Sequence, residues 1–438
     1  MTKIPKSTPV LTDSIDICHA LVGLKDIFII GYCRKGPVGQ MIIEQKVSQV
    51  ICPRCGKPAV VKDRATVTYT DLACYGTPMK LKWKKHRIAC NNRSCPVETF
   101  TLGDHPIAAK GCRLTTRAAK WATKQIGEGR TIRDVAKELG CSWGVVSRAV
   151  NIYGTALIEA DRKRLKDTKA VGLDETLFVK RGKFKEKHWS TSVVDVQNSQ
   201  LIDIVPTRNF VEVAGFFDKT PEHFKANVSY AALDMSQTYS AVFSQMLPNA
   251  TQVVDRFHLI RLANAVVDQV RRRVQYQQLG HRGRRGDPLF GIRKLLVMRS
   301  DHLDEKMTEK IQSLLSFGDP DGEIALAYAL KEAVHTFYES SDFSSAKELL
   351  GEITAHCAKK SMPEEIRRLG RTIKKWFDKI LAYHWARITN APTEGLNNLI
   401  KRVKRTAYGF SNFENFRVRA LLYAGKPNWR VLDSIVVR

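Results

Sequence analysis

Two short-spaced cysteine pairs constrain the fold of this chain more than any other feature of its sequence. The first is Cys52-x2-Cys55 in CPRCGK, and the second is Cys90-x4-Cys95 in CNNRSC. A tetrahedral zinc ion takes four soft ligands, and each pair can supply two of them from a tight turn. We therefore predict a zinc ribbon with a structural Zn²⁺. The widened second spacing leaves His86 as an alternative ligand, and the competing interpretation is four ordinary buried cysteines.

The remaining cysteines favour a reducing compartment. The other six of the ten show no pairing, so we expect thiols and metal ligands rather than disulfides. The start of the chain lacks an apolar core followed by a small-residue cleavage site, and no apolar run approaches the length of a membrane span. These observations predict a soluble, cytoplasmic protein.

The charge balance favours a polyanionic partner. The chain of 438 residues has 71 Lys and Arg against 44 Asp and Glu, a net charge of +27. Such an excess attracts nucleic acid, although a solubility feature or a ribosome-related bias is the alternative explanation. The 43% of hydrophobic residues suffice for several cores and more than one domain.

The stretch TIRDVAKELGCSWGVVSRAVNIYG predicts a helix-turn-helix. Its apolar residues have the spacing of two helices, and Gly140 lies where the sharp bend needs a positive φ. The second helix would enter the major groove by its N-terminal end. The side chains predicted to contact DNA are Ser142, Trp143, Ser147 and Arg148. Many helical hairpins of this kind bind nothing. The prediction that this one binds DNA therefore depends on the neighbouring zinc module and the positive net charge.

Three acids lie at the ends of predicted elements. Asp174 follows an apolar strand in KAVGLDETLFV, where Glu175 must point to the opposite face, and Asp234 ends the strand in YAALDMS. Glu394 begins NAPTEGLNNLIKRVKR, in which every other charged side chain is Lys or Arg. Hard divalent cations take oxygen ligands, and three carboxylates can hold two such ions. The alternative for each acid is a helix cap or a surface charge.

Other acids resemble these candidates. Asp195 and Asp203, on the hairpin between the first two acids, are similar in appearance but not selected. Asp255 and His258 in VVDRFH follow another strand and form a competing metal site, unless His258 is a core histidine bonded to a neighbour.

The order of these patterns predicts a multidomain α+β protein. We expect an N-terminal β-rich segment (1–48), the zinc ribbon (49–104) and the helix-turn-helix domain (105–160). A β-rich core begins at residue 161 and continues to 438, with a charged helical insertion at about 266–380.

Taken together, these motifs resemble the DDE transposases of bacterial insertion sequences, specifically the ISL-three family, from about residue 40 to the C-terminus. The matching motifs, in order, are CPRCG with its later cysteines, the helix-turn-helix, GLDE, LDMS, DRFH, NAPTEGLNNLIKRVKRTAYGF and FENFRVRALL. The resemblance implies a ribonuclease-H-like α/β catalytic domain (161–438) whose all-helical insertion separates the second and third acids.

The resemblance also implies roles for individual residues. Asp174, Asp234 and Glu394 are the first, second and third acids, which would hold two Mg²⁺ or Mn²⁺ ions. Asp255-x-x-His258 matches the family's Cys/Asp-x-x-His signature beside the site, with His258 as a supporting catalytic residue. Asp234 is preferred to Asp255 as second acid because a helix follows it before the next strand.

The implied activity is binding of an element's terminal inverted repeats, metal-dependent cleavage at the ends, and strand transfer into target DNA. The implied partners are double-stranded DNA and a second copy of the chain. A nuclease-only relative and a domesticated zinc and helix-turn-helix regulator without catalysis are the alternatives.

Basic residues outside the helix-turn-helix are predicted to contact phosphates. If a helix starts near Glu394, then Asn397, Asn398 and three cations follow on or near one face. The phosphate-binding candidates are Lys401, Arg402 and Arg405 on this helix, and Arg271, Arg272 and Arg273 in the insertion.

Overall fold

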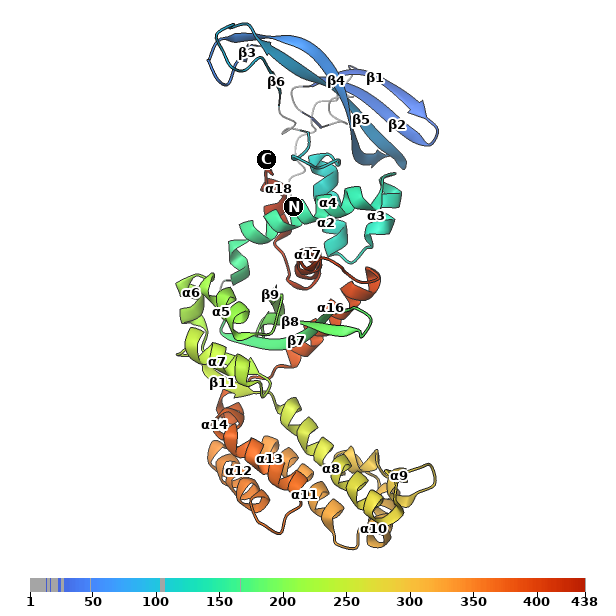
Figure 1. Ribbon diagram of the computed structural model, residues 1–438, viewed down its shortest axis with the longest axis vertical. Helices are drawn as coiled ribbons and strands as arrows, with labels where there is room; N and C mark the ends of the chain where they lie inside the picture. Colours follow the sequence, from blue (N-terminus) through green and yellow to red (C-terminus); the bar gives the residue numbers. More distant parts are fainter. Residues whose placement is uncertain are drawn as a thin grey trace, which may run out of the picture. The chain divides into compact units, whose positions relative to one another are not determined.

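The computed structural model describes residues 13, 16, 23–24, 27–47, 49–102, 107–165 and 167–437. The chain forms two compact units (Figure 1). Unit 1 comprises Met1–Arg164 and Lys401–Arg438, and unit 2 comprises Leu165–Ile400. None of the described helices is long and apolar enough to span a membrane.

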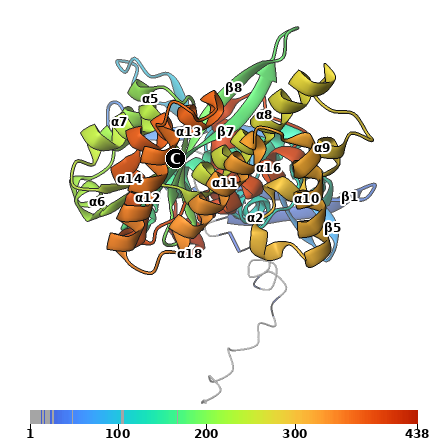
Figure 2. The same cartoon turned by 90° about the horizontal axis from the view of Figure 1, so that it is seen from below.

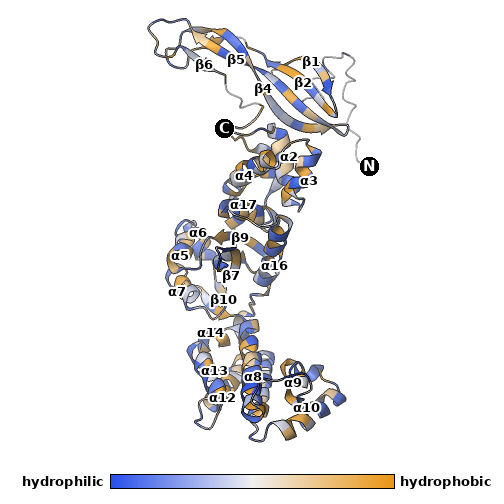
Figure 3. Ribbon diagram, turned by 45° about the vertical axis from the view of Figure 1, so that its right-hand side comes forward, coloured by the Kyte–Doolittle hydropathy of each residue, from blue (hydrophilic) through white to orange (hydrophobic). Residues whose placement is uncertain are grey.

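Unit 1 begins with a sheet of order β1-β2-β5-β4-β3, with β6 paired to β5. The strands are β1 (Ile27–Lys35), β2 (Val38–Gln45), β3 (Val50–Ile51), β4 (Pro58–Cys74), β5 (Thr77–Cys90) and β6 (Thr99–Thr101). The long β4–β5 hairpin turns at Tyr75 and Gly76, both with positive φ, as a two-residue turn requires. Apolar and polar residues alternate along β5 (Figure 3), so that Leu81 and Trp83 are buried in one small core.

The helices of unit 1 come from two distant parts of the sequence. They are α2 (Thr116–Gly127), α3 (Ile132–Glu138), α4 (Trp143–Ala160), α17 (Phe413–Ala424) and α18 (Trp429–Ser434). A Cβ on Gly154 of α4 would lie 2.6 Å from Val418 of α17, so the absence of a side chain permits this close packing. The predicted catalytic domain of 161–438 differs from this division, because residues 401–438 pack with the helix-turn-helix.

Unit 2 contains a five-stranded sheet of order β11-β10-β7-β8-β9. The strands are β7 (Ala170–Arg181), β8 (Glu186–Asp195), β9 (Gln200–Val205), β10 (Tyr230–Leu233) and β11 (Thr251–Val254). Strands β7, β8 and β9 are antiparallel neighbours, whereas β10 and β11 run parallel to β7. Three short helices follow β9 or connect the parallel strands: α5 (Phe210–Asp218), α6 (Glu222–Asn227) and α7 (Gln237–Met246).

A helical segment separates β11 from α16 (Ala391–Thr406), the helix in which the boundary between the units falls. Its α-helices are α8 (Arg256–Leu279), α9 (Pro288–Gly291), α10 (Glu305–Gly318), α11 (Glu323–Glu339), α12 (Phe343–Cys357), α13 (Glu364–Lys375), α14 (Phe377–Leu381) and α15 (Tyr383–Ala386). Figure 2 shows α11, α12 and α13 packed together, and their apolar faces join one continuous core with the sheet. The helices begin at Arg256, about ten residues before the predicted start of the insertion.

Candidate active site and DNA-binding surfaces

Three aspartates occupy matching positions on three neighbouring parallel strands: Asp234 and Asp255 directly follow β10 and β11, whereas Asp174 lies within β7 and not at its predicted end, just after the part of β7 that pairs with β10. Leu233 pairs with Leu173 on one side and with Val254 on the other. The next residues along the chain are therefore Asp174, Asp234 and Asp255, in matching positions at one edge of the parallel ladder. Because carboxyl ends of parallel strands meet at one edge, two of the predicted acids are brought together by strand register alone.

Two hydrogen bonds orient the Asp174 carboxylate, one from the backbone of the next residue and one from a side-chain amide on α16. Its Oδ1 accepts the N–H of Glu175 at 2.7 Å, and its Oδ2 accepts Nδ2 of Asn397 at 2.8 Å. The Ser192 hydroxyl donates to Oδ1 of Asn397 at 3.1 Å, which fixes the amide with its NH₂ group toward the carboxylate. Asn397 is 4% exposed and Ser192 is fully buried. Asn397 therefore attaches α16 to β7 at the first acid.

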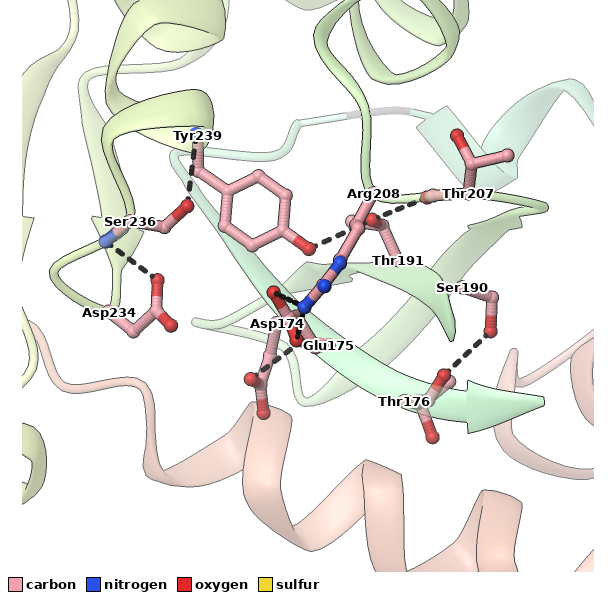
Figure 4. Close-up of polar contacts among 10 residues, drawn as sticks. All are labelled: Asp174, Glu175, Thr176, Ser190, Thr191, Thr207, Arg208, Asp234, Ser236 and Tyr239. Carbon is pink, nitrogen blue, oxygen red and sulfur yellow. Dashed lines mark hydrogen bonds and ion pairs between the residues drawn. The ribbon is translucent and has the colours of Figure 1, made fainter. Parts of the chain in front are cut away.

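Asp174 and Asp234 are neighbouring, half-buried carboxylates (Figure 4). Burial raises the pKa of Asp174, the N–H of Glu175 opposes this, and the Asp234 carboxylate adds to it. Burial likewise raises the pKa of Asp234, whereas nearby His258 lowers it. Among the described residues, neither acid has an ion pair with Lys or Arg. Arg261 also lowers the pKa of Asp234, so the pair is a site of negative charge that nearby cations compensate only in part.

Glu394 lies in the first turn of α16 and is exposed. It precedes Asn397 by three residues, so both lie on neighbouring parts of one helix face. In the described part of the chain, the only group of three or more ligand residues with all atoms within 4.8 Å is the cysteine cluster. At least one pair among Asp174, Asp234 and Glu394 therefore has its ligand atoms farther apart than this distance.

Asp255 connects the start of α8 to the segment before α16. Its Oδ1 accepts the N–H of Asn390 at 3.2 Å, and its Oδ2 lies 3.3 Å from Nδ1 of His258. Asp255 is 5% exposed, and both of its oxygens have protein partners. This arrangement favours a structural role beside the acids over the competing interpretation of an independent metal site.

Glu175 and Arg208 form an ion pair on the other face of β7 (Figure 4). The two side chains approach to 2.9 Å, while Tyr239 of α7 bonds Thr191 of β8 at 2.9 Å. Glu175 is also close enough to Asp234 to raise the pKa of that acid. Arg208 was not anticipated from the sequence, because no local pattern pairs it with Glu175.

The two unselected acids of the hairpin have structural surroundings. Asp195 is 2% exposed and accepts bonds from the Thr168 hydroxyl and from the backbone and side chain of Asn198, each at 2.9 Å. Asp203 is 7% exposed and accepts the N–H of Ile204 at 2.7 Å. Neither lies in the matching register position that Asp174 and Asp234 share.

The four predicted zinc ligands converge at one end of the sheet in unit 1. The sulfur atoms of Cys52 and Cys95 are 3.9 Å apart, and those of Cys55 and Cys90 are 3.6 Å apart. All four lie within 4.8 Å of one another, a spacing that suits a tetrahedral ion with thiolate ligands. Backbone N–H groups lower the pKa of Cys52 and Cys55, whereas burial and the neighbouring sulfur atoms raise the pKa of Cys90 and Cys95. His86 is not part of the cluster, since its Nε2 bonds Glu44 at 2.7 Å.

The helix-turn-helix forms as predicted. Gly140 has φ +61° at the turn, and Thr131 caps α3 by accepting the N–H of Asp134 at 3.1 Å. Ser142, Trp143 and Arg148 are exposed at the start of α4. Ser147 differs from the prediction: it is 7% exposed because it lies on the packed face of the helix, so it is not available for a DNA contact.

The arginines of α8 also differ from the prediction. Arg271 is 2% exposed and bonds Asp268 at 2.6 Å and Gln275 at 2.9 Å, so it belongs to the interior of the helical segment. Arg273 pairs with Glu323 at 2.8 Å and with Glu365 at 2.9 Å. Arg272 is the most exposed of the three, although it too pairs with Asp268. Only the fold could reveal the partners of Arg273, because both glutamates are distant from it in sequence.

On α16, by contrast, Lys401, Arg402 and Arg405 are all exposed. They follow Glu394 along the same helix, as predicted. The residues that sequence reasoning did not assign a role are Asn397, Ser192 and Arg208. The sequence feature that could have indicated a role for Asn397 is its position one helical turn after Glu394.

Two family models match this sequence. A model described as a transposase of the ISL3 family covers residues 171–420, and a helix-turn-helix domain of transposase family ISL3 covers residues 104–153. The solved strand transfer complex of the Drosophila P element transposase aligns with a TM-score of 0.40 and 11% identity, over 73% of this chain and 94% of that one.

Curated relatives agree with the family models. The transposase of insertion sequence IS1001 from Bordetella parapertussis is 24% identical over 378 residues, which are 85% of this chain and 88% of the relative. The transposase of IS1557 from Mycobacterium tuberculosis is 23% identical over 341 residues, covering 70% and 74%. The chain belongs to the ISL3 family of insertion-sequence transposases and is a DNA-binding transposase.

Proposed function

We propose that this transposase cleaves DNA at the ends of its insertion sequence with divalent cations and joins the 3′ ends to target DNA. The catalytic acids in this proposal are Asp174, Asp234 and Glu394, on a ribonuclease-H-like domain. The mixed sheet of unit 2, with its helical segment between the second and third acids, supports this assignment. The strongest support is the side-by-side position of Asp174 and Asp234, two half-buried acids with raised pKa values and with no Lys or Arg ion pair among the described residues.

The donor set fits hard divalent ions such as Mg²⁺ or Mn²⁺. Carboxylate oxygens are the ligands these ions prefer, and binding would neutralise the remaining negative charge of the two half-buried acids. Bound ions would supply an activated water or 3′ hydroxyl and stabilise the leaving oxygen. Asp174 would present the oxygen lone pairs that Glu175 and Asn397 leave free, and Glu394 would approach from the first turn of α16.

Four other residues of unit 2 support these metal ligands. Asn397 fixes the orientation of the Asp174 carboxylate, and Ser192 fixes the amide of Asn397. Asp255 secures the backbone of Asn390, four residues before Glu394. His258 lowers the pKa of both Asp174 and Asp234, so its positive form would favour their ionised state.

We also propose that unit 1 recognises the element ends. Ser142, Trp143 and Arg148 at the start of α4 would contact bases or phosphates, and Lys401, Arg402 and Arg405 would contact phosphates. A structural Zn²⁺ on Cys52, Cys55, Cys90 and Cys95 would stabilise the sheet of a zinc ribbon. Two ends must be processed together, so we propose a homodimer on DNA.

Incubating the purified full-length protein with DNA that carries the element's own ends tests the proposed activity. We expect strand cleavage at the ends with Mg²⁺ or Mn²⁺ and none with a chelator. Cleavage without joining of the 3′ ends to target DNA would indicate a nuclease-only protein. End binding without cleavage under any divalent ion would favour a DNA-binding regulator instead.

Replacing Asn397 by Leu is expected to raise the Mg²⁺ concentration needed for half-maximal cleavage by about 10- to 100-fold, as loss of a ligand-orienting partner typically does. Leu has a similar branched shape but cannot donate to Asp174. Asn398→Leu is the matched control, because Asn398 is the exposed next residue of the same helix. Equal metal requirements in the two variants would show that Asn397 does not orient Asp174.

A further inference from the structure

Arg419 is a buried cation without an anionic partner. It lies on α17 and is 6% exposed. Its Nε has no hydrogen-bond partner, and its guanidinium lies 5.0 Å from the centre of the Phe410 ring. Among the described residues, no carboxylate forms an ion pair with it. Burial lowers the pKa of Arg419 to about 10, so the side chain still carries its charge at neutral pH.

An uncompensated buried charge destabilises a protein unless something pairs with it. Arg271 in unit 2 shows the usual solution, since it is also buried but bonds Asp268 and Gln275. Arg419 has no such pair, although its neighbour Arg417 pairs with Glu414 at 3.4 Å. Because no carboxylate among the described residues pairs with Arg419, we infer that a bound ligand supplies its counter-ion.

A pocket of about 840 Å³ opens beside Arg419. Its lining includes Arg133, Lys137, Trp143, Thr406 and Tyr408 as well as Arg419. One acid, Asp134, also lines it, but its carboxylate accepts a bond from the Thr131 hydroxyl at 2.7 Å. The cations thus outnumber the acid, and the pocket suits an anion.

Two aromatic side chains lie in this lining with large exposed surfaces. Trp143 is 55% exposed and Tyr408 is 97% exposed. Tyr408 has φ +55°, a conformation uncommon for residues other than glycine, and it lies two residues after the end of α16. Trp143 is the first residue of α4, whose N-cap Ser142 forms no side-chain capping bond. The pocket therefore adjoins the end of the helix that is expected to enter DNA.

We propose that this pocket binds a backbone phosphate of the element's end DNA, with Arg419 as its buried charge and Trp143 and Tyr408 against the adjoining sugars or bases. The inference rests on the proposed recognition of ends by unit 1 and not on the catalytic acids. Arg133 and Lys137 add positive charge around the phosphate. The Arg419 charge then stabilises the complex with end DNA, although it does not stabilise the free protein.

Replacing Arg419 by Met separates this role from a structural one. We expect the melting temperature of the free protein to stay unchanged or rise, because an unpaired buried charge is replaced by an apolar side chain. Affinity for end DNA, measured without divalent ions, should fall by about 10- to 100-fold, with the salt dependence reduced by about one phosphate contact. Arg417→Met, with the same loss of charge on the same helix, should retain nearly all of its affinity.

Two further measurements test the contact made by Tyr408 and the binding of free phosphate. Tyr408→Ala changes an almost fully exposed side chain, so it should fold normally and bind ends about fivefold or more weakly, as loss of a stacking contact does. Inorganic phosphate should raise the melting temperature of the wild-type protein but not that of Arg419→Met. A destabilised Arg419→Met protein with unchanged end affinity would overturn the proposal. Phosphate stabilisation with unchanged end affinity would assign the pocket to a free anion and would equally overturn it.

Discussion

Replacement of Asp174 or Asp234 by Asn, or of Glu394 by Gln, is expected to abolish end cleavage while end binding is retained. Each change removes one carboxylate ligand and leaves the ions' charge under-neutralised, so we expect a loss of at least about 10³-fold in cleavage rate. Residues that act as one unit are not additive, so the triple variant should be no worse than a single one. Cleavage and gel-shift assays on the same end DNA would measure both properties.

The neighbouring acids provide the controls for this prediction. Asp203→Asn should retain cleavage, and Asp195→Asn should retain it with a lower melting temperature, because Asp195 accepts three hydrogen bonds in the interior. Asp255→Asn and His258→Ala should reduce cleavage without removing it, since both act through other groups. An active Asp234→Asn protein beside an inactive Asp255→Asn protein would mean that the second acid lies one strand further along.

The sequence allowed the candidate acids to be found but not their spatial relation. Each of the segments AVGLD, YAALD and TQVVD reads as an apolar strand followed by Asp, and nothing local separates them. Their equivalence became visible only from the pairing of Leu233 with both Leu173 and Val254. Strand order and register depend on long-range packing, which a pattern of period two does not encode.

Charged residues were the least predictable part of the sites. Arg271 and Arg419 occur in helices with many other cations, where a solvated face or a phosphate contact is the natural expectation. In the structure both are buried, one with Asp268 and one without a carboxylate partner among the described residues. Burial of a single side chain depends on which elements pack against its helix, so composition could not distinguish the two cases.

The cysteine cluster was predictable because its signal is local. Two tight turns, each with a cysteine pair, need only be joined by paired strands to bring four sulfur atoms together. The β4–β5 ladder does this by placing Ala59 opposite Cys90. The widened spacing of the second pair is accommodated by the turn in which the N–H of Cys95 bonds the carbonyl of Asn92 at 2.9 Å.

Loss of zinc from this cluster is expected to loosen one end of the sheet in unit 1 and to weaken end binding. Without the ion, four sulfur atoms within 4.8 Å of one another have no cation to hold their thiolate forms together. The core around Leu81 and Trp83 does not contain these cysteines, so we expect local rather than global unfolding. Cys55→Ala should thus raise hydrogen exchange in β3 and β6 while the centre of β5 stays protected.

Cys74→Ala is the matched control, because Cys74 is an exposed cysteine at the opposite end of β4. Native mass spectrometry should show one zinc per wild-type or Cys74→Ala chain and none for Cys55→Ala. End affinity should follow the zinc content, since the sheet is joined to the helix-turn-helix through Asp71, which accepts bonds from Thr115 at 2.6 Å and Arg117 at 2.8 Å. A zinc-free wild-type protein with the same exchange pattern and end affinity would show that the cysteines are ordinary core residues, and that the sheet positions the helix-turn-helix without a metal.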